Sequence, residues 1–226
     1  AVGIGLRSAH HAAFLAQPES VDFVEVHAEN FMVAGGAARA LLHEVRRTRP
    51  LSLHAVSLGL GSALVVDTLH LGKLAALVRE FEPALVSDHA CFCRSTMPGQ
   101  PHAVHGADLL PLAFTDASLG ILSRNVQHVQ EALQRPLLVE NLSAYVALDG
   151  ADCTEPEFLN ALAARTGCQL LVDVNNIYVN ALNAGGRADR PAALASCRAW
   201  LDAIDAGAVA EVHLAGHCEL PDIVID

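Results

Sequence analysis

The sequence predicts an α/β fold in which parallel strands close into a TIM-type (β/α)8 barrel. Short apolar segments alternate with longer helix-like segments along most of the chain, and such alternation is typical of βαβ units with right-handed crossovers. Nearly every expected strand also ends in residues with metal-ligand or acid/base chemistry. In a barrel all these ends meet at one mouth, whereas in a doubly wound sheet only the ends beside the switch point converge.

Seven strands and five helices are expected. The strands are mostly apolar rather than strictly alternating, as parallel strands covered on both faces usually are. They are predicted at 2–6, 22–27, 51–55, 84–89, 136–141, 169–174 and 209–214. The helices are predicted at 36–47, 67–80, 115–134, 155–166 and 191–206. Seven strands leave the barrel one strand short within a single expected domain, residues 1–226.

Several helix boundaries carry recognisable signals. Asp67 and Thr115 suit N-caps, because their side chains can accept hydrogen bonds from the first free backbone N–H groups. Pro156 and Pro191 suit a first helical turn, and Gly167 suits a C-cap.

Composition excludes several classes of partner. The chain has 226 residues, with 14 basic and 25 acidic side chains and a formal net charge of −11. This balance argues against nucleic-acid binding, which needs clustered Lys and Arg facing phosphates. No apolar run reaches the roughly 18 residues of a membrane span, and the N-terminal AVGIGLR lacks the pattern of a secretory signal. We therefore expect a cytoplasmic protein without a membrane partner, whose six cysteines are reduced.

The strand ends predict a metal site with mixed nitrogen and oxygen ligands. His54, His89 and His213 lie at the ends of three strands, and Glu140 and Asp173 end two others. Imidazole with carboxylate suits Fe, Mn or Zn, and the central strand position of Glu140 suits a bridge between two ions. A single histidine is more often an ordinary core or surface residue, but three unpaired ones at buried strand ends would be costly.

Further polar residues near these ends are candidates for substrate binding. Arg7, at the end of the first strand, either binds a substrate carboxylate or pairs with an acid. Glu25, Asn30 and Asn141 lie at or just after strand ends, although asparagine is equally common in turns. Asp88 is either a ligand or a partner that fixes a histidine tautomer.

Seven segments resemble, in their order, those of a known family. They are GIGLR (3–7), EVHAENFM (25–32), LSLHAVSLGLGS (51–62), SDHACF (87–92), LLVENLSAYV (137–146), LLVDVNNIYVNA (170–181) and EVHLAGH (211–217). Together they are similar to the multinuclear non-haem iron-dependent oxidative enzymes, which include the methanobactin-biosynthesis oxidase and UPF0276-type bacterial proteins. The resemblance runs through the whole chain and is specific to the family, not to a substrate.

The resemblance implies a TIM barrel with two or three irons at its mouth. The matching positions imply the iron ligands His54, His89, Glu140, Asp173, Asn175 and His213, and Asn176 stands where some members have a further histidine. Among these, Glu140 and Asp173 would be the catalytic carboxylates that hold the irons close together. Members of the family use O2 and mixed-valent iron to oxidise cysteines of ribosomally made peptides, usually with a small partner protein that recruits the precursor. The family continues into an eighth strand with acidic ligands, so the resemblance implies a barrel that is C-terminally incomplete at Asp226.

Two other classes stay open. A xylose-isomerase-like or endonuclease-IV-like barrel, a sugar isomerase or hydrolase, also gathers His, Asp and Glu on divalent metals. The usual isomerase lysine has no counterpart, because Lys73 is the only lysine and lies in an expected helix, and the charge of −11 disfavours phosphate backbones. A non-catalytic metal- or peptide-binding subunit would hold metal without consuming O2.

Overall fold

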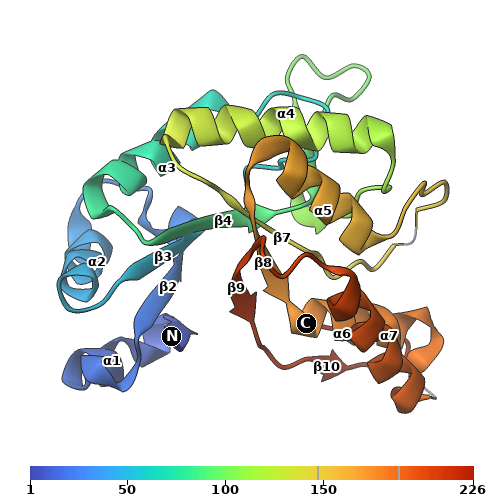
Figure 1. Ribbon diagram of the computed structural model, residues 1–226. Coiled ribbons are helices and arrows are strands. Elements are labelled where there is room, and N and C mark those ends of the chain that lie inside the picture. The colour runs from blue at the N-terminus through green and yellow to red at the C-terminus, as the bar shows by residue number, and fades with distance from the viewer. Residues whose placement is uncertain (147, 188) are drawn as a thin grey trace.

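The sheet is the central feature of the computed structural model, which describes residues 1–146, 148–187 and 189–226. Seven parallel strands follow one another in chain order: β1 (Gly3–Gly5), β2 (Phe23–His27), β3 (Leu51–His54), β4 (Leu85–His89), β7 (Leu138–Glu140), β8 (Gln169–Asp173) and β9 (Val209–His213). The sheet curls into a half-barrel with helices on its outer side (Figure 1). All seven predicted strands and the α/β class are therefore confirmed.

The register of the sheet aligns the polar strand ends. His27 pairs with His54 across β2 and β3, His89 pairs with Glu140 across β4 and β7, and Asp173 pairs with His213 across β8 and β9. Because paired residues in neighbouring strands project to the same side, this register places the side chains together at one edge of the curled sheet.

The five predicted helices form close to their expected bounds. They are α2 (Gly36–Thr48), α3 (Thr68–Phe81), α4 (Asp116–Leu133), α5 (Glu155–Thr166) and α7 (Arg190–Ala203). Asp67 accepts hydrogen bonds from the backbone N–H groups of Leu69 and His70 at the start of α3. Thr115 caps α4 in the same way, and Gly167 ends α5 with a φ of 69°. The predicted capping residues are thus confirmed.

Other elements were not predicted. They are α1 (His11–Ala16), α6 (Val174–Ala181) with the π-helical turn Leu182–Gly186, the hairpin β5 (Phe92–Ser95) and β6 (Val104–Leu110), and the short pair β10 (Cys218–Glu219) and β11 (Val224–Ile225). Three 3-10 turns cover Ser8–His10, Pro18–Ser20 and Ala28–Phe31. The helix α6 begins directly after β8 because the Asp173 side chain accepts a hydrogen bond from the Asn176 N–H and caps it.

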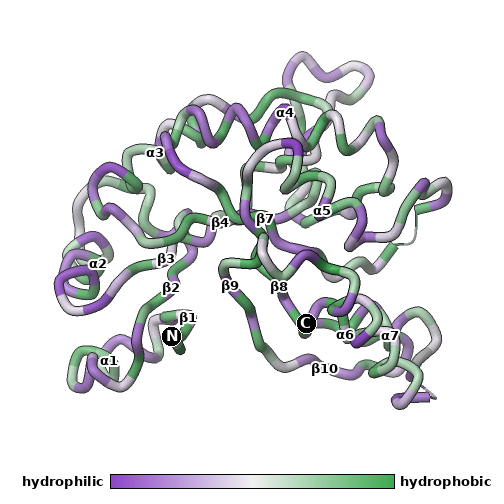
Figure 2. The backbone as a smooth tube through the Cα atoms, viewed as in Figure 1, coloured by the Kyte–Doolittle hydropathy of each residue, from purple (hydrophilic) through white to green (hydrophobic). Residues whose placement is uncertain are grey.

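The core lies between the convex side of the sheet and the helices. Leu53, Leu77, Leu122, Val139 and Leu170 are all completely buried there, and Figure 2 shows hydrophobic residues along the central strands. The six cysteines are free thiols. Among the described helices, none is both long and apolar enough to cross a membrane.

Candidate metal centre

Three side chains from neighbouring strand ends form the first cluster of potential metal ligands. His54, His89 and Glu140 are buried, and one ligand atom from each lies within 4.8 Å of the others. The Nε2 atoms of His54 and His89 lie 3.4 and 3.2 Å from the same atom, Glu140 Oε2. Two imidazole nitrogens therefore converge on one carboxylate oxygen.

A second cluster shares Glu140 with the first. His213 Nδ1 lies 3.2 Å from Glu140 Oε1 and 3.8 Å from Asp173 Oδ2, and the three residues form a group within ligand distance. Glu140 thus presents Oε2 to the histidine pair and Oε1 to the group on β8 and β9. This is the arrangement that a carboxylate bridging two ions requires.

Unsatisfied buried atoms test whether a metal fits. Within the described residues, Glu140 Oε2 and His89 Nδ1 are buried without a hydrogen-bond partner, although two imidazole nitrogens stand close to Glu140 Oε2. Since buried polar atoms are normally hydrogen-bonded, such atoms point to an additional ligand. His54 Nδ1 lies 2.7 Å from Ser87 Oγ, which leaves Nε2 as the nitrogen that faces Glu140. Buried imidazole and carboxylate ligands of this kind suit iron, manganese or zinc.

The electrostatics of the two clusters differ. Burial lowers the pKa of His54 well below its ordinary value and that of His89 to about 4, so both rings are neutral and have a free lone pair at neutral pH. Burial raises the pKa of Glu140 to about 7, against the opposing effect of its hydrogen bond with His213. For His213, burial alone would lower the pKa, but hydrogen bonds to Glu140 and Glu25 raise it to about 11. The carboxylates around His213 therefore stabilise a positive charge in the second cluster.

A third group lies on the other side of His213. His213 Nε2 is 3.1 Å from Glu25 Oε1. Ser52 Oγ lies 3.4 Å from Glu25 Oε2 and also 3.4 Å from Glu211 Oε2. Glu25, Glu211 and His213 form a group within ligand distance, and burial raises the pKa of Glu211 to about 7. Glu211 was not among the predicted site residues. Its position two residues before His213 on a strand was the signal, because side chains at that spacing share a face.

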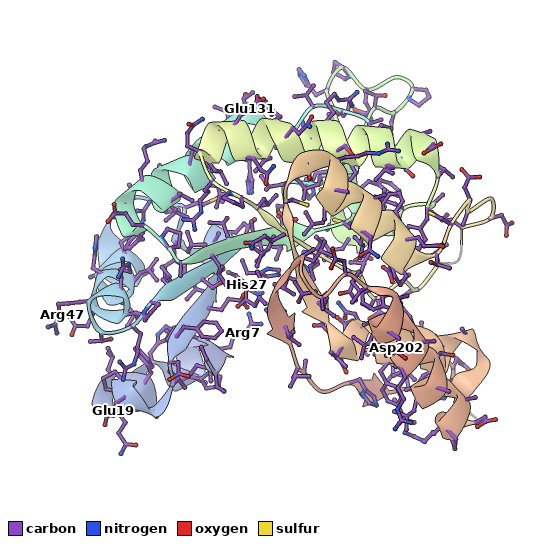
Figure 3. All side chains as sticks on the ribbon, viewed as in Figure 1. Arg7, Glu19, His27, Arg47, Glu131 and Asp202 are labelled. Carbon is purple, nitrogen blue, oxygen red and sulfur yellow. The ribbon has the colours of Figure 1, made fainter. Side chains whose placement is uncertain are left out.

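The predicted substrate-binding residues take different positions. Arg7 is exposed, and its Nη1 lies 3.1 Å from His27 Nε2 rather than beside an acid, as Figure 3 shows. Asn30 is exposed in the turn after β2, whereas Glu25 is buried beside His213. Asn141 is fully buried.

The buried asparagines brace the strand ends. Asn141 exchanges two hydrogen bonds with the backbone of Asp173, at 2.8 and 3.0 Å. Asn176 donates to the Asn141 carbonyl at 3.0 Å, and Asn175 is buried with its Nδ2 unpartnered within the described residues. Asp88 accepts hydrogen bonds from the backbone N–H groups of Leu58 and His89. Its carboxylate lies 3.9 Å from His89 Nδ1, too far to fix the tautomer by hydrogen bonding.

Solved structures share the fold at low sequence identity. A D-psicose 3-epimerase from Clostridium cellulolyticum H10 matches with a TM-score of 0.53 and 8% identity. The match covers 77% of this chain and 64% of the epimerase chain, which is less than two thirds of it. A 3-keto-D-glucoside 4-epimerase from E. coli matches with a TM-score of 0.52 and 12% identity, covering 95% of this chain and 78% of that one. These neighbours are TIM barrels, so the curled sheet corresponds to part of such a barrel.

Sequence relatives are much closer. A UPF0276 protein of Rhizorhabdus wittichii is 45% identical over 226 residues, covering 99% of this chain and 76% of the relative. A UPF0276 protein of Chromobacterium violaceum is 43% identical over 224 residues, covering 99% and 75%. The RiPP precursor modification enzyme family MbnB/TglH/ChrH matches residues 1–226, where RiPP denotes a ribosomally made, post-translationally modified peptide. With its whole length matched, this chain belongs to the MbnB/TglH/ChrH family of RiPP precursor modification enzymes.

Proposed function

We propose that this chain is a multinuclear non-haem iron oxidase that uses O2 to oxidise cysteine residues of a ribosomally made precursor peptide. The shared carboxylate of Glu140 carries the proposal, because its two oxygens face two separate groups of potential ligands. A carboxylate in that position would hold two ions close enough together to share the electrons released in the oxidation. The family supports the peptide as the class of substrate.

The proposed iron ligands follow from the two clusters. His54, His89 and Glu140 would hold one ion, and Glu140, Asp173 and His213 the other. Asn175 is the proposed additional ligand, since its buried amide has an unpartnered nitrogen and an amide can be turned to present its oxygen. Glu25 and Glu211 would hold a third ion, and His213 would be a ligand of only one of the two neighbouring ions, because a neutral imidazole has a single free lone pair.

The chain's own residues set the conditions for the chemistry. Bound iron would supply the electron transfer and O2 activation that cysteine oxidation needs, with open positions for the substrate sulfur. Burial of His54, His89 and Glu140 excludes water from this region. Asn141 clamps the end of β7 to the end of β8 and so fixes Glu140 and Asp173 relative to one another.

Substrate binding is assigned to the open side of the site. Arg7 is exposed, and its guanidinium group can pair with a carboxylate of the peptide. Asn30 is exposed on the turn that follows β2, where its amide can form hydrogen bonds with a peptide backbone. Glu25 lies deeper, beside His213. A small partner protein that recruits the precursor completes the proposal, and the reaction is placed in the cytoplasm, where ribosomes make the peptide.

Iron loading tests the proposal directly. The chain is purified without oxygen, reconstituted with iron, and analysed for metal content and by Mössbauer spectroscopy. We expect at least two antiferromagnetically coupled irons per chain. Glu140→Gln should abolish the coupling, whereas Glu131→Gln, at an exposed position on α4, should preserve it.

The competing functions give different results. Zinc or manganese binding with no uptake of iron would indicate a hydrolytic or isomerase barrel. Coupled iron without O2 consumption on any cysteine-containing peptide would indicate a metal- or peptide-binding subunit. The proposal requires O2 consumption that is lost when the substrate cysteine is replaced by serine.

A further inference from the structure

A cavity lies apart from the proposed metal ligands, between α5, α6 and α7. Its volume is about 560 Å³, and Figure 1 shows α6 and α7 side by side with α5 next to them. Glu155 comes from the first turn of α5, Ile177 and Asn180 from α6, and Trp200 from α7. Small residues such as Ala193 complete the wall and leave the cavity open.

The lining of this cavity is mostly small or apolar, with two carboxylates and one indole among its residues. Glu155 and Asp189 supply two carboxylates, and no Lys, Arg or His is among the described residues that line it. Trp200 Nε1 donates a hydrogen bond to Glu155 Oε2 at 2.9 Å, so the indole and the carboxylate are held together. In the described part of the chain, Glu155 forms no ion pair, and burial raises its pKa to about 7. The cavity therefore holds a partly buried carboxylate without a cation.

We propose that this cavity binds a lysine or arginine side chain of the peptide substrate. Glu155 would form a charge-assisted hydrogen bond with the ammonium or guanidinium group, and Trp200 would contact the cation or its alkyl stem. The small residues of α7 leave room for the stem. The proposal rests on the proposed function, which supplies a peptide as the ligand.

The helix α6 connects this cavity with the metal centre. Asp173 caps α6, and Ile177 and Asn180, one and two turns further on, line the cavity. Seven residues of helix span about 10 Å, a distance that about three to five residues of extended peptide cover. A basic residue at that spacing from the modified cysteine can thus occupy the cavity while the cysteine is at the metal centre.

Trp200 provides a direct measurement, because it is the only tryptophan in the chain. The purified chain is titrated with acetyl-Gly-Lys-Gly-amide while its tryptophan fluorescence is followed, and acetyl-Gly-norleucine-Gly-amide serves as the neutral analogue. We expect saturable binding of the lysine peptide and at least about tenfold weaker binding of the analogue. Glu155→Gln should remove this preference, and Asp202→Asn, at an exposed position on α7, should leave it unchanged.

Two further readouts separate the outcomes. Ser196→Leu places a larger side chain in the lining of the cavity and keeps Glu155. It should weaken binding of both peptides, so it tests the proposal independently of Glu155→Gln. Equal binding of the two peptides, or binding unaffected by either variant, would overturn the proposal. Iron content and coupling are measured on the same samples. Lysine binding in a chain that takes up no iron would leave the cavity's role intact and refute the proposed oxidase.

Discussion

At the scale of single residues, hydrogen bonds to the proposed ligands decide how these side chains are oriented. Ser87 is completely buried, and its hydroxyl lies 2.7 Å from His54 Nδ1. It thereby orients the imidazole so that Nε2 points at Glu140. Such partners of metal-binding histidines are energetically important, because they fix both the ring orientation and the tautomer.

Ser87→Ala should therefore weaken iron binding by about 10- to 100-fold while leaving the fold intact. The measurement is a competition titration of iron against a chelator of known affinity. Ser123→Ala is the matched control, since the Ser123 hydroxyl is buried on α4 with no hydrogen-bond partner in the described structure. Equal iron affinity in both variants would show that Ser87 does not orient His54.

Glu155 makes the stability of the chain depend on pH. Its pKa is raised by burial from 4.5 to about 7, so between these values the folded chain holds a proton that the unfolded chain has released. Stability therefore falls as the pH rises through this window, and the loss persists above it. Glu155→Gln should stabilise the chain by about 1–3 kcal/mol at pH 8 and have little effect at pH 4.5. Thermal unfolding at both pH values checks this, with Glu131→Gln as the exposed control.

At the scale of secondary-structure elements, the helix ends show where local sequence dictates conformation. Gly167 has a φ of 69° at the C-terminus of α5, and Gly120 lies inside α4, in its second turn, at an exposed position. An added methyl group would meet no atom within 4 Å at either position. The two glycines therefore differ in backbone conformation and not in packing.

Opposite effects are expected when each glycine is replaced by alanine. Gly167→Ala should destabilise the chain by about 1 kcal/mol, because a left-handed conformation is unfavourable for any residue with a Cβ. Gly120→Ala should stabilise it by up to about 1 kcal/mol, because alanine is the better helix former. Urea denaturation of both variants provides the comparison. A loss of stability in Gly120→Ala would show that packing, not backbone conformation, dominates at that site.

The sequence patterns located the strands and helices well and the finer elements poorly. Apolar runs ending in polar residues were sufficient to identify β3, β4 and β8, and these ends do meet in space. The helix α6 was not predicted, because Asn175 and Asn176 are as compatible with a loop turn as with the first turn of a helix. His89 lies opposite Glu140 because of the register in which β4 pairs with β7, and the Arg7–His27 contact likewise joins residues from different segments. Neither contact can be derived from the sequence of a single strand.

Site residues without a distinctive pattern were the hardest to predict. Glu211 is hidden beside the more conspicuous His213, and Ser87 carries no chemical signature of its own. The lining of the cavity that contains Glu155 and Trp200 comes from α5, α6 and α7, three segments separated along the chain. Its residues become a site only when these helices pack together. Neither the hydrophobic periodicity nor the spacing of residues in the sequence predicts how these three helices pack.

At the scale of the whole molecule, net charge affects which peptides approach. The chain carries a formal charge of −11, so it attracts basic peptides over distances comparable with the Debye length. Raising the salt concentration from 50 to 500 mM should weaken binding of the lysine peptide several-fold and leave the norleucine peptide unchanged. The fluorescence titration measures both. Equal salt dependence of the two peptides would contradict an electrostatic contribution.

The spread of the proposed ligands along the chain has a consequence for the order of folding. His54 and His213 are separated by most of the sequence, and they meet only when β3 to β9 are paired in the correct register. A one-residue slip in any strand would turn its ligand to the opposite side of the sheet. A metal site is therefore absent early in folding, and ions bind only after the sheet has formed. Iron should consequently slow unfolding of the native chain without accelerating its refolding, which stopped-flow measurements with and without iron can determine.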